Sequence, residues 1–454
     1  MKKQLHGVHV PHRKNTAELQ PVRLPDPQFV ELPMSMHIGA PAKPVVKPGD
    51  QVKIGQLIAE AGGFVSAPIY ASVSGTVKRI GEKLLSSGRM SQTIVIESDG
   101  KSEMWEGLTP PKLETTQDFL DAVRASGVVG LGGAGFPTAV KLTVKNLDMV
   151  QAVIVNGAEC EPYITSDTRT MIDRAQRVIY GAELVQKFLQ VPRIIFAIED
   201  NKPYCLRVYR KLVAEEENME VCALPSTYPQ GGEKVLIYNT MGKVVPEGKL
   251  PLDVGAIVLN CTTLKHIGAY CKTGVPLVDK CITVDGSAVR KPKNVLVPIG
   301  MSMRDVFEAT GGFCKEPKKV LYGGPMMGIA VPDLDQPILK NTNAIIALAE
   351  EDATVPEPTA CIHCGRCIAH CPLNLQPAEL EQAYLKKDVE KLKELKVNIC
   401  MECGCCSFGC PANRPLVQTN KLSKAMLAAY NAQQKAMEEQ RKANEPKEKE
   451  AAKA

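Results

Sequence analysis

Two apolar runs in the middle of the chain each end on polar residues. The run MVQAVIVNG occupies 149–157, and the run AIVLNCTTL occupies 256–264. Both patterns indicate strands buried in a sheet, with Asn156 and Asn260 at their ends. Because ligands of open α/β sheets bind beyond the carboxyl ends of the strands, we interpret these ends as parts of a candidate binding site.

Alternating apolar and polar positions flank this region on both sides. In 38–80, alternating valines separated by Gly and Pro turns predict short strands. In 280–312, alternating strands flank an Asp-Gly turn at 285–286, which is a hairpin signal. A helix is expected to start at Ser302, with Asp305 placed as in a capping box.

The C-terminal quarter of the chain has a helical pattern. Apolar residues recur at roughly helical spacing between 373 and 399, and Pro377 suits the first turn of a helix. The last residues, 428–454, carry many charges and almost nothing to bury. We expect a frayed helix or a disordered charged tail there.

Length and composition describe an ordinary multidomain protein. A chain of 454 residues is too long for one core, so two to four domains are expected. Apolar content of 44% and charged content of 23% are ordinary for soluble proteins, and a net charge of +5 does not predict a nucleic-acid partner. No apolar run approaches the roughly 18 residues that a membrane span needs. The N-terminus lacks the apolar segment of a secretory signal, so a cytoplasmic location, or attachment to a membrane through partners, is expected.

The 16 cysteines change this picture. The pattern C-x2-C-x2-C-x3-C-P occurs twice, at 361–372 and at 400–411. This run is typical of two-cluster ferredoxins, in which the fourth cysteine of each run binds the other cluster. We therefore expect two [4Fe–4S] clusters, the first held by Cys361, Cys364, Cys367 and Cys410, and the second by Cys371, Cys400, Cys403 and Cys406.

A pair of structural zinc sites is the alternative, since C-x2-C pairs would suffice for zinc. Two complete copies with matched Cys-Pro endings favour clusters. Cys405 breaks the spacing of the second motif and is interpreted as a packed thiol beside the cluster. The seven cysteines outside the motifs are expected to be small buried residues.

A glycine-rich stretch at 127–142 reads GVVGLGGAGFPTAVKL and contains G-x-G-x-x-G. Residues without side chains let backbone N–H groups approach a phosphate closely, and Lys141 can add a positive charge. The signal alone is weak, because glycine-rich turns are common. Phe136 and Pro137 also do not fit an ordinary Rossmann helix start, so a generic turn stays open as the alternative.

Two further stretches are rich in polar residues, one after a strand-like run and one before a helix-like run. They read NGAECEPYITSD at 156–167 and STYPQGGEKVLI at 226–237. Each carboxylate taken alone is more often a helix cap or part of a solvated loop. Together with the glycine-rich stretch and the polar end of AIVLNCTTL, these make four polar clusters in sequence, which favours a shared site.

These segments resemble a known family. GLGGAGFPTAVK, NGAECEP and YPQGGEK look like the flavin- and NADH-binding segments of the NADH-oxidising flavoprotein subunit of respiratory complex I. Together with the two C-terminal cluster motifs and the stretch HIGAPAKPVVKPGDQVKIG, they resemble the C subunits of Rnf electron transport complexes more closely. The resemblance runs from about residue 30 to 425.

The resemblance implies an FMN and a nicotinamide site. The implied cofactor-binding residues are Gly130, Gly132, Gly133, Gly135, Phe136, Lys141, Asn156, Glu159, Glu161, Tyr228, Gly231, Glu233, Asn260 and Thr263. Among them Phe136, Glu161 and Glu233 fall where the complex I family contacts NADH, and no protein side chain is expected to be catalytic. The sequence departs from that family's pattern at Leu131, Ala158, Gly232 and Val144, so flavin binding is better supported than nucleotide docking.

The expected fold is a multidomain α/β protein. The expected parts are an N-terminal extension with a barrel-sandwich, lipoyl-like module (1–100), a Rossmann-like FMN/NAD domain (101–255), a β-grasp, SLBB-like domain (256–335), a linker (336–352), an α-helical two-cluster ferredoxin domain (353–427) and the tail (428–454). Residues 54–77 contain no lysine, which excludes the swinging prosthetic group of lipoyl domains.

The expected function follows from electron counting. A hydride carries two electrons and a cluster handles one, so a flavin is the natural converter between NAD⁺/NADH and the clusters. The resemblance implies a peripheral subunit on the cytoplasmic side of the membrane, working with integral-membrane and ferredoxin-accepting subunits in ferredoxin:NAD⁺ oxidation–reduction coupled to Na⁺ or H⁺ transport. Two alternatives remain: a subunit of a soluble bifurcating dehydrogenase or hydrogenase, and an electron relay without flavin.

Overall fold

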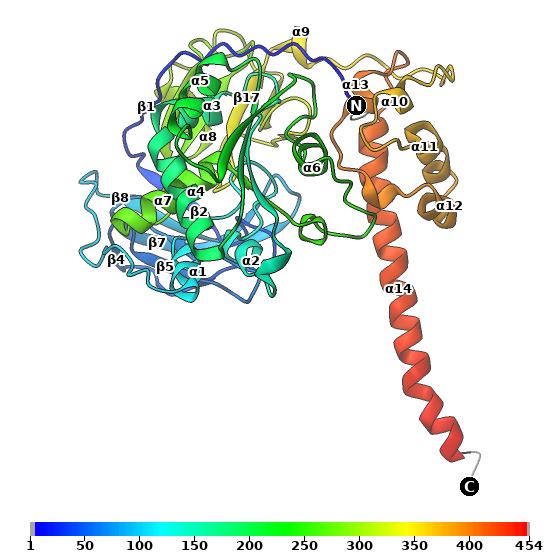
Figure 1. Ribbon diagram of the computed structural model, residues 1–454, viewed down its shortest axis with the longest axis horizontal. Coiled ribbons are helices and arrows are strands. Elements are labelled where there is room, and N and C mark those ends of the chain that lie inside the picture. The colour runs from blue at the N-terminus through cyan, green and yellow to red at the C-terminus, as the bar shows by residue number, and fades with distance from the viewer. Residues whose placement is uncertain (1–4, 452–454) are drawn as a thin grey trace. The chain divides into compact units, whose positions relative to one another are not determined.

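A computed structural model describes residues 5–451, with side chains described to residue 441. The chain divides into two compact units (Figure 1). The first unit is Val10–Thr354, and the second comprises Val355 onward together with the stretch before Val10. Among the described residues, no helix is both long and apolar enough to cross a bilayer.

The centre of the first unit is a four-stranded parallel sheet in the order β11-β10-β9-β12. Its strands are β9 (Ala152–Gly157), β10 (Ile194–Glu199), β11 (Met219–Leu224) and β12 (Ala256–Asn260). The first apolar side chains of β9 alternate between two cores: Val153 packs with α4 and α7, and Ile154 packs with α6. Burial on both faces explains why these strands appear as continuous apolar runs.

Helices cover both faces of this sheet. They are α1 (Thr116–Ala125), α2 (Thr138–Leu142), α3 (Ser166–Asp173), α4 (Ala175–Leu189), α5 (Pro203–Leu212), α6 (Glu233–Met241) and α7 (Cys261–Thr273), with short 3-10 turns η1 (Leu147–Met149) and η2 (Pro251–Val254). Since β12 and α7 belong to this sheet and its helical layer, the α/β domain extends beyond the boundary expected at 255. That boundary separated β12 from its parallel partner β9, a pairing that no local pattern reveals.

The N-terminal module is a pair of small antiparallel sheets. One has the order β2-β8-β7-β4 and the other β3-β5-β6. The strands are β2 (Phe29–Pro33), β3 (Lys43–Pro44), β4 (Gln51–Val52), β5 (Leu57–Glu60), β6 (Ile69–Tyr70), β7 (Gly75–Leu84) and β8 (Met90–Ser98). Its buried side chains belong to the same core cluster as those of the α/β domain. The module is therefore packed onto the α/β domain.

A six-stranded mixed sheet in the order β1-β14-β13-β17-β15-β16 completes the first unit. Its strands are β1 (Val22–Arg23), β13 (Asp279–Asp285), β14 (Lys293–Pro298), β15 (Lys319–Tyr322), β16 (Ile329–Ala330) and β17 (Ala344–Leu348). The hairpin β13–β14 is confirmed, and Ser302 caps α8 (Met303–Ala309) through its hydroxyl and the Asp305 N–H. The linker expected at 336–352 is wrong, because it contains the fully buried strand β17 in the middle of this sheet and most of α9 (Glu350–Ala353).

The second unit is helical, as expected. It contains α10 (Arg366–Ala369), α11 (Pro377–Leu385), α12 (Val389–Glu394), η3 (Val397–Ile399), α13 (Cys405–Phe408) and α14 (Leu416–Ala451). Leu380, Leu392 and Leu427 form its core, where α11 and α12 pack on the first part of α14 (Figure 1). Of the two expectations for the tail, a frayed helix or a disordered segment, the structure shows helix: α14 continues to Ala451, and this stretch is rich in Ala, Gln, Glu and Lys, which favour helix.

Candidate functional site

The polar ends of β9 and β12 lie at the point where the strand order of the parallel sheet reverses. β10 and β11 lie to one side of β9, and β12 lies to the other. Asn156 and Asn260 are paired neighbours at the carboxyl ends of these two strands. Open α/β sheets bind ligands at such a switch point.

The glycine loop at 130–136 lies against this edge. A Cβ atom added at Gly132 would stand 2.4 Å from Nδ2 of Asn260, so a side chain does not fit there. The base of the loop is closed by the Gly130 N–H, which donates to the Phe136 carbonyl at 2.9 Å. The Leu131 N–H donates to Oγ1 of Thr263 at 3.1 Å.

The loop offers unused backbone donors. Within the described chain, the N–H groups of residues 132–136 find no acceptor at ordinary hydrogen-bond geometry, and residues 132–134 are exposed. Successive free backbone N–H groups form an anion-binding concavity. The loop therefore offers donors of the kind that a phosphate group accepts from.

A lysine and a carboxylate face each other beside the loop. Nζ of Lys141 lies 2.9 Å from Oε1 of Glu233 and donates to the Val258 carbonyl at 3.1 Å. The two side chains keep 35% and 40% of their surface exposed. The glycine-rich stretch and the YPQGGEK stretch, far apart in the sequence, are thus joined at one site.

The loop after β9 contacts the YPQGGEK stretch as well. Nδ2 of Asn156 donates to the Gly231 carbonyl at 2.9 Å, and the Gly231 N–H donates to Sγ of Cys160 at 3.3 Å. Tyr228, from the same stretch, is buried. A Cβ atom added at Gly231 would lie at van der Waals distance from Ala158 and Cys160.

The two glutamates of NGAECEP hold neighbouring backbone. Glu159 accepts from the Asp167 N–H at 2.6 Å and the Thr168 N–H at 3.1 Å, at the start of α3. Glu161 accepts from the N–H groups of Met326 (3.1 Å) and Met327 (2.7 Å). Burial raises the pKa of both carboxyl groups to about 7. In this structure both side chains position loops.

Asn260 and Thr263 are also positioning residues. Oδ1 of Asn260 accepts from the N–H groups of Thr262 and Thr263 and so caps α7. Its Nδ2 donates to Oδ2 of Asp167 at 2.7 Å. Thr263 is buried, and its hydroxyl donates to the Val129 carbonyl at 3.2 Å. Asn260 thus links the glycine loop to α3.

Two lysines at the site, half-buried Lys14 and buried Lys202, were not found from the sequence. Nζ of Lys14 donates to the carbonyls of Glu159 (2.7 Å), Glu161 (2.8 Å) and Ile164 (2.6 Å). Lys202 donates to the Ala158 carbonyl and pairs with Glu199 at 2.7 Å. Lys14 is about 150 positions from its partners, so no local signal points to it.

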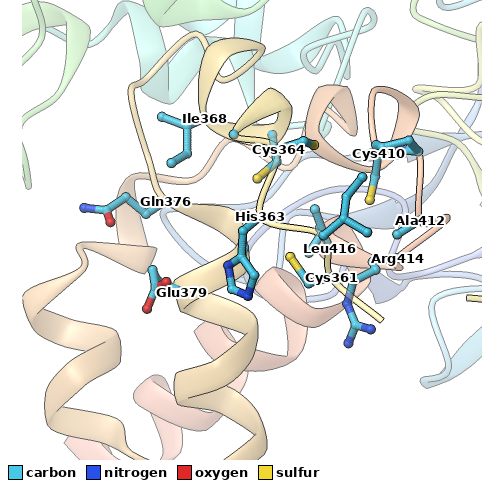
Figure 2. A pocket seen from close by; sticks show the side chains of 15 residues that line it. Cys361, His363, Cys364, Ile368, Gln376, Glu379, Cys410, Ala412, Arg414 and Leu416 are labelled. Atoms are coloured by element: carbon cyan, nitrogen blue, oxygen red, sulfur yellow. The ribbon is translucent and has the colours of Figure 1, made fainter. Parts of the chain in front are cut away.

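In the second unit, the two predicted cysteine quartets each line one cavity. Figure 2 shows the sulfurs of Cys361, Cys364 and Cys410 turned toward a shared space, with His363 and Arg414 at its border. The full sets of lining cysteines are Cys361, Cys364, Cys367 and Cys410 for the first cavity and Cys371, Cys400, Cys403 and Cys406 for the second. Each set contains one cysteine from the other motif, which is the exchange expected for a two-cluster ferredoxin.

The surroundings of the two quartets differ. In the first, Cys364 is exposed and its three companions are half-buried, whereas three of the four cysteines of the second are buried. Among the described residues, no three His, Cys, Asp or Glu side chains are close enough to hold a lone metal ion. Cys405 is fully buried, and its thiol hydrogen bonds with Cys403.

Comparison with known families matches each part of this architecture. The family models are the RnfC barrel sandwich hybrid domain (3–101), the Nuo51 FMN-binding domain (123–269), the SLBB domain (281–330) and the 4Fe-4S dicluster domain (353–411). The expected multidomain fold is confirmed. The fold and sites define an electron-transfer flavoprotein with FMN and two [4Fe–4S] clusters.

Curated relatives give the family. The chain is 43% identical over 82% of its length to the C subunit of the proton-translocating ferredoxin:NAD(+) oxidoreductase complex of Clostridium ljungdahlii, covering 82% of it. It is 41% identical over 83% to the C subunit of the Na(+)-translocating complex of Acetobacterium woodii, covering 86%. It is 37% identical over 93% to the C subunit of the ion-translocating oxidoreductase complex of Rhodobacter capsulatus, covering 82%. The chain belongs to this family of C subunits.

Solved structures show a related fold. Crystal structures of an NAD+-reducing [NiFe]-hydrogenase match with TM-scores of 0.50 (air-oxidised) and 0.51 (H2-reduced), at 20% and 18% identity. They cover 69% and 70% of this chain, which spans 66% and 61% of the hydrogenase chains. At this identity the likeness concerns the fold alone.

Proposed function

We propose that this chain transfers electrons between NAD⁺/NADH, FMN and two [4Fe–4S] clusters as a subunit of an ion-translocating ferredoxin:NAD⁺ oxidoreductase. The observation that carries the proposal is the set of unused N–H groups at 132–136, which lies at the switch point of the parallel sheet. The same chain carries two cysteine quartets. FMN supplies the exchange between two-electron hydride chemistry and one-electron cluster chemistry.

The chain's own residues bind and orient the cofactor. The N–H groups of the glycine loop receive the phosphate, and Lys141 adds a positive charge that Glu233 holds in place at 2.9 Å. The loops that border the flavin are fixed by hydrogen bonds of Asn156, Glu159 and Asn260. No nucleophile or general acid from the protein is required.

The nicotinamide nucleotide is proposed to approach between the glycine loop and the NGAECEP and YPQGGEK stretches. Half-buried Phe136 offers an aromatic face there, and Glu233 keeps 40% of its side-chain surface exposed. Glu161 acts by holding the backbone at 326–327 through its two hydrogen bonds.

The cysteine quartets are proposed as the cluster ligands. Cys361, Cys364, Cys367 and Cys410 hold the first cluster, and Cys371, Cys400, Cys403 and Cys406 hold the second. What supports this assignment is that each set lines one cavity. The clusters carry single electrons, and burial and N–H···S bonds from the chain tune their potentials.

Partners are required for the rest of the reaction. We propose that integral-membrane subunits move Na⁺ or H⁺ and that a ferredoxin-accepting subunit exchanges electrons with this chain, which lies peripherally on the cytoplasmic face of the membrane. Two relatives are named as subunits of proton- and Na(+)-translocating complexes, which supports this arrangement.

The proposal is tested by NADH oxidation with a one-electron acceptor such as ferricyanide, using the full chain reconstituted with iron, sulfide and FMN. Lys141→Ala is expected to lower FMN occupancy and activity together. Lys145→Ala removes an exposed lysine four residues away and is the matched control. Activity without bound FMN, or full FMN occupancy in Lys141→Ala with wild-type activity, would contradict the assignment of this site.

A further inference from the structure

Three alternate carbonyl groups of the glycine loop are held from outside the α/β domain. The Leu131 carbonyl accepts from Nζ of Lys280 at 2.8 Å, and the Gly133 carbonyl accepts from Nδ2 of Asn341 at 2.9 Å. The Gly135 carbonyl accepts from the Ile38 N–H at 3.2 Å. Each carbonyl thus has a fixed partner.

These partners come from different parts of the first unit. Lys280 lies on β13, and Asn341 lies in the segment just before β17, so both belong to the six-stranded sheet region. Ile38 follows β2 of the N-terminal module. The α/β domain therefore does not fix the shape of its glycine loop alone.

Holding these carbonyls also orients the loop's N–H groups. A trans peptide is planar, with its C=O and the following N–H pointing in opposite directions. The cis peptide of the described chain lies elsewhere, at Tyr228–Pro229. The N–H groups of Gly132, Ala134 and Phe136 are therefore turned away from the three partners, and they are among the donors left unused.

Lys280 is the strongest of the three partners. Its side chain is 2% exposed, and burial lowers its pKa to about 8, so it is still protonated at neutral pH. A charged donor polarises the peptide group whose carbonyl it binds, which strengthens that group's N–H as a donor. In this case the strengthened donor is the Gly132 N–H.

We propose that Lys280 and Asn341 are positioning residues of the FMN phosphate site. By holding the carbonyls of Leu131 and Gly133, they keep the N–H groups of Gly132 and Ala134 directed at the phosphate. The inference rests on the proposed function of the loop. It adds that the six-stranded sheet region, and not only the Rossmann-like domain, determines flavin affinity.

The prediction is specific to the phosphate. FMN and riboflavin share the isoalloxazine ring and differ in the terminal phosphate, so a loop that binds phosphate distinguishes them. Equilibrium dialysis of the full, cluster-loaded chain under anaerobic conditions measures the dissociation constants for FMN and for riboflavin. The variants are Asn341→Ala and Lys280→Met, with Asn343→Ala and Lys293→Met as matched controls from the same sheet.

Asn341→Ala is expected to weaken FMN binding about tenfold, and Lys280→Met about thirtyfold, because each removes an N–H···O or N⁺–H···O bond that orients a donor. Riboflavin affinity and both controls are expected to stay at wild-type values. Asn341 is only half-buried, so its variant keeps the test valid if Lys280→Met does not fold.

Other results overturn the inference in distinguishable ways. Unchanged FMN affinity in Asn341→Ala shows that the loop does not need its outside partners. Equal weakening of FMN and riboflavin assigns the partners a general structural role. If the wild-type chain binds neither flavin, the proposed function of the loop fails along with the inference.

Discussion

Replacing Lys14 by methionine is expected to destabilise the site from a distance of about 150 residues in sequence. Nζ of Lys14 donates to three carbonyls of the loop 159–164 at 2.6–2.8 Å, and the lysine itself is half-buried. Methionine fills most of the same volume and provides no donor. The loop that carries Glu159 and Glu161 is then left with three unsatisfied carbonyls.

The magnitude follows from that count. A buried acceptor that loses its partner costs about 1–3 kcal/mol, and the three carbonyls share one donor, so a total loss of about 3–5 kcal/mol is expected. The burial cost of the lysine, which lowers its pKa, offsets part of the loss. Glu159, which the positive charge of Lys14 helps to keep ionised, is expected to titrate at higher pH in the variant.

Urea denaturation followed by circular dichroism measures this loss, with FMN occupancy as a second readout. Exposed Lys47 on the same N-terminal region provides the control variant Lys47→Met. A decrease in the free energy of unfolding below about 1 kcal/mol in Lys14→Met would refute the reasoning, since it would approach the roughly 0.5 kcal/mol that surface substitutions alone give.

Three further predictions concern the clusters and the carboxyl groups. Asn420 is 1% exposed, and its Nδ2 lies 3.6 Å from Sγ of Cys400. Because this hydrogen bond would stabilise the reduced cluster, Asn420→Leu is expected to lower the midpoint potential of the second cluster, by ~59 mV if the equilibrium shifts tenfold. An EPR-monitored redox titration measures the potential, and an unchanged value argues against the bond. Cys364→Ser is expected to remove about half of the bound iron and leave the EPR signal of one isolated reduced cluster, whereas retention of both clusters would exclude Cys364 as a ligand. The raised pKa of Glu161, from 4.5 to about 7, means that the folded state binds the extra proton, so its contribution to stability is complete below pH 4.5 and is lost as the pH rises through 7. Glu161→Gln is therefore expected to flatten the fall in melting temperature between pH 5.5 and 8, by roughly 1–2 °C per kcal/mol for a unit of this size. An identical slope in wild type and variant would contradict this.

Much of the site could be predicted because its signals are local. The cluster ligands follow from spacings of two and three residues, and the structure gathers the same two sets of cysteines around two cavities. Asn156 and Asn260 were found because apolar runs identify strands and polar residues mark their ends. The glycine loop was found from its G-x-G-x-x-G pattern, and in the structure Gly132 lies against Asn260, where a side chain would clash.

The rest depends on contacts between distant segments. Lys14, Lys280 and Asn341 lie in unremarkable local sequence, and their importance comes from partners 145 to 208 positions away. The strand β17 was missed for a related reason. It lies in the middle of a sheet built from several parts of the chain, so its pairing partners cannot be identified from its own residues.

The carboxylates show a different limit. The pattern NGAECEP follows strand β9 as expected, but sequence alone assigns Glu159 and Glu161 to cofactor contact. In the structure their oxygens accept backbone N–H groups of α3 and of residues 326–327. A carboxylate at a strand end satisfies either role, and only the arrangement of neighbouring loops decides between them.

The most direct test of the central claim is an anaerobic titration of the full reconstituted chain with NADH, monitored by visible absorbance and by EPR of the same samples. The account predicts that NADH bleaches the flavin absorbance and that electrons then appear on [4Fe–4S] clusters within the same chain. A flavin that is bound but stays oxidised after excess NADH would contradict the claim that the nicotinamide site is on this chain.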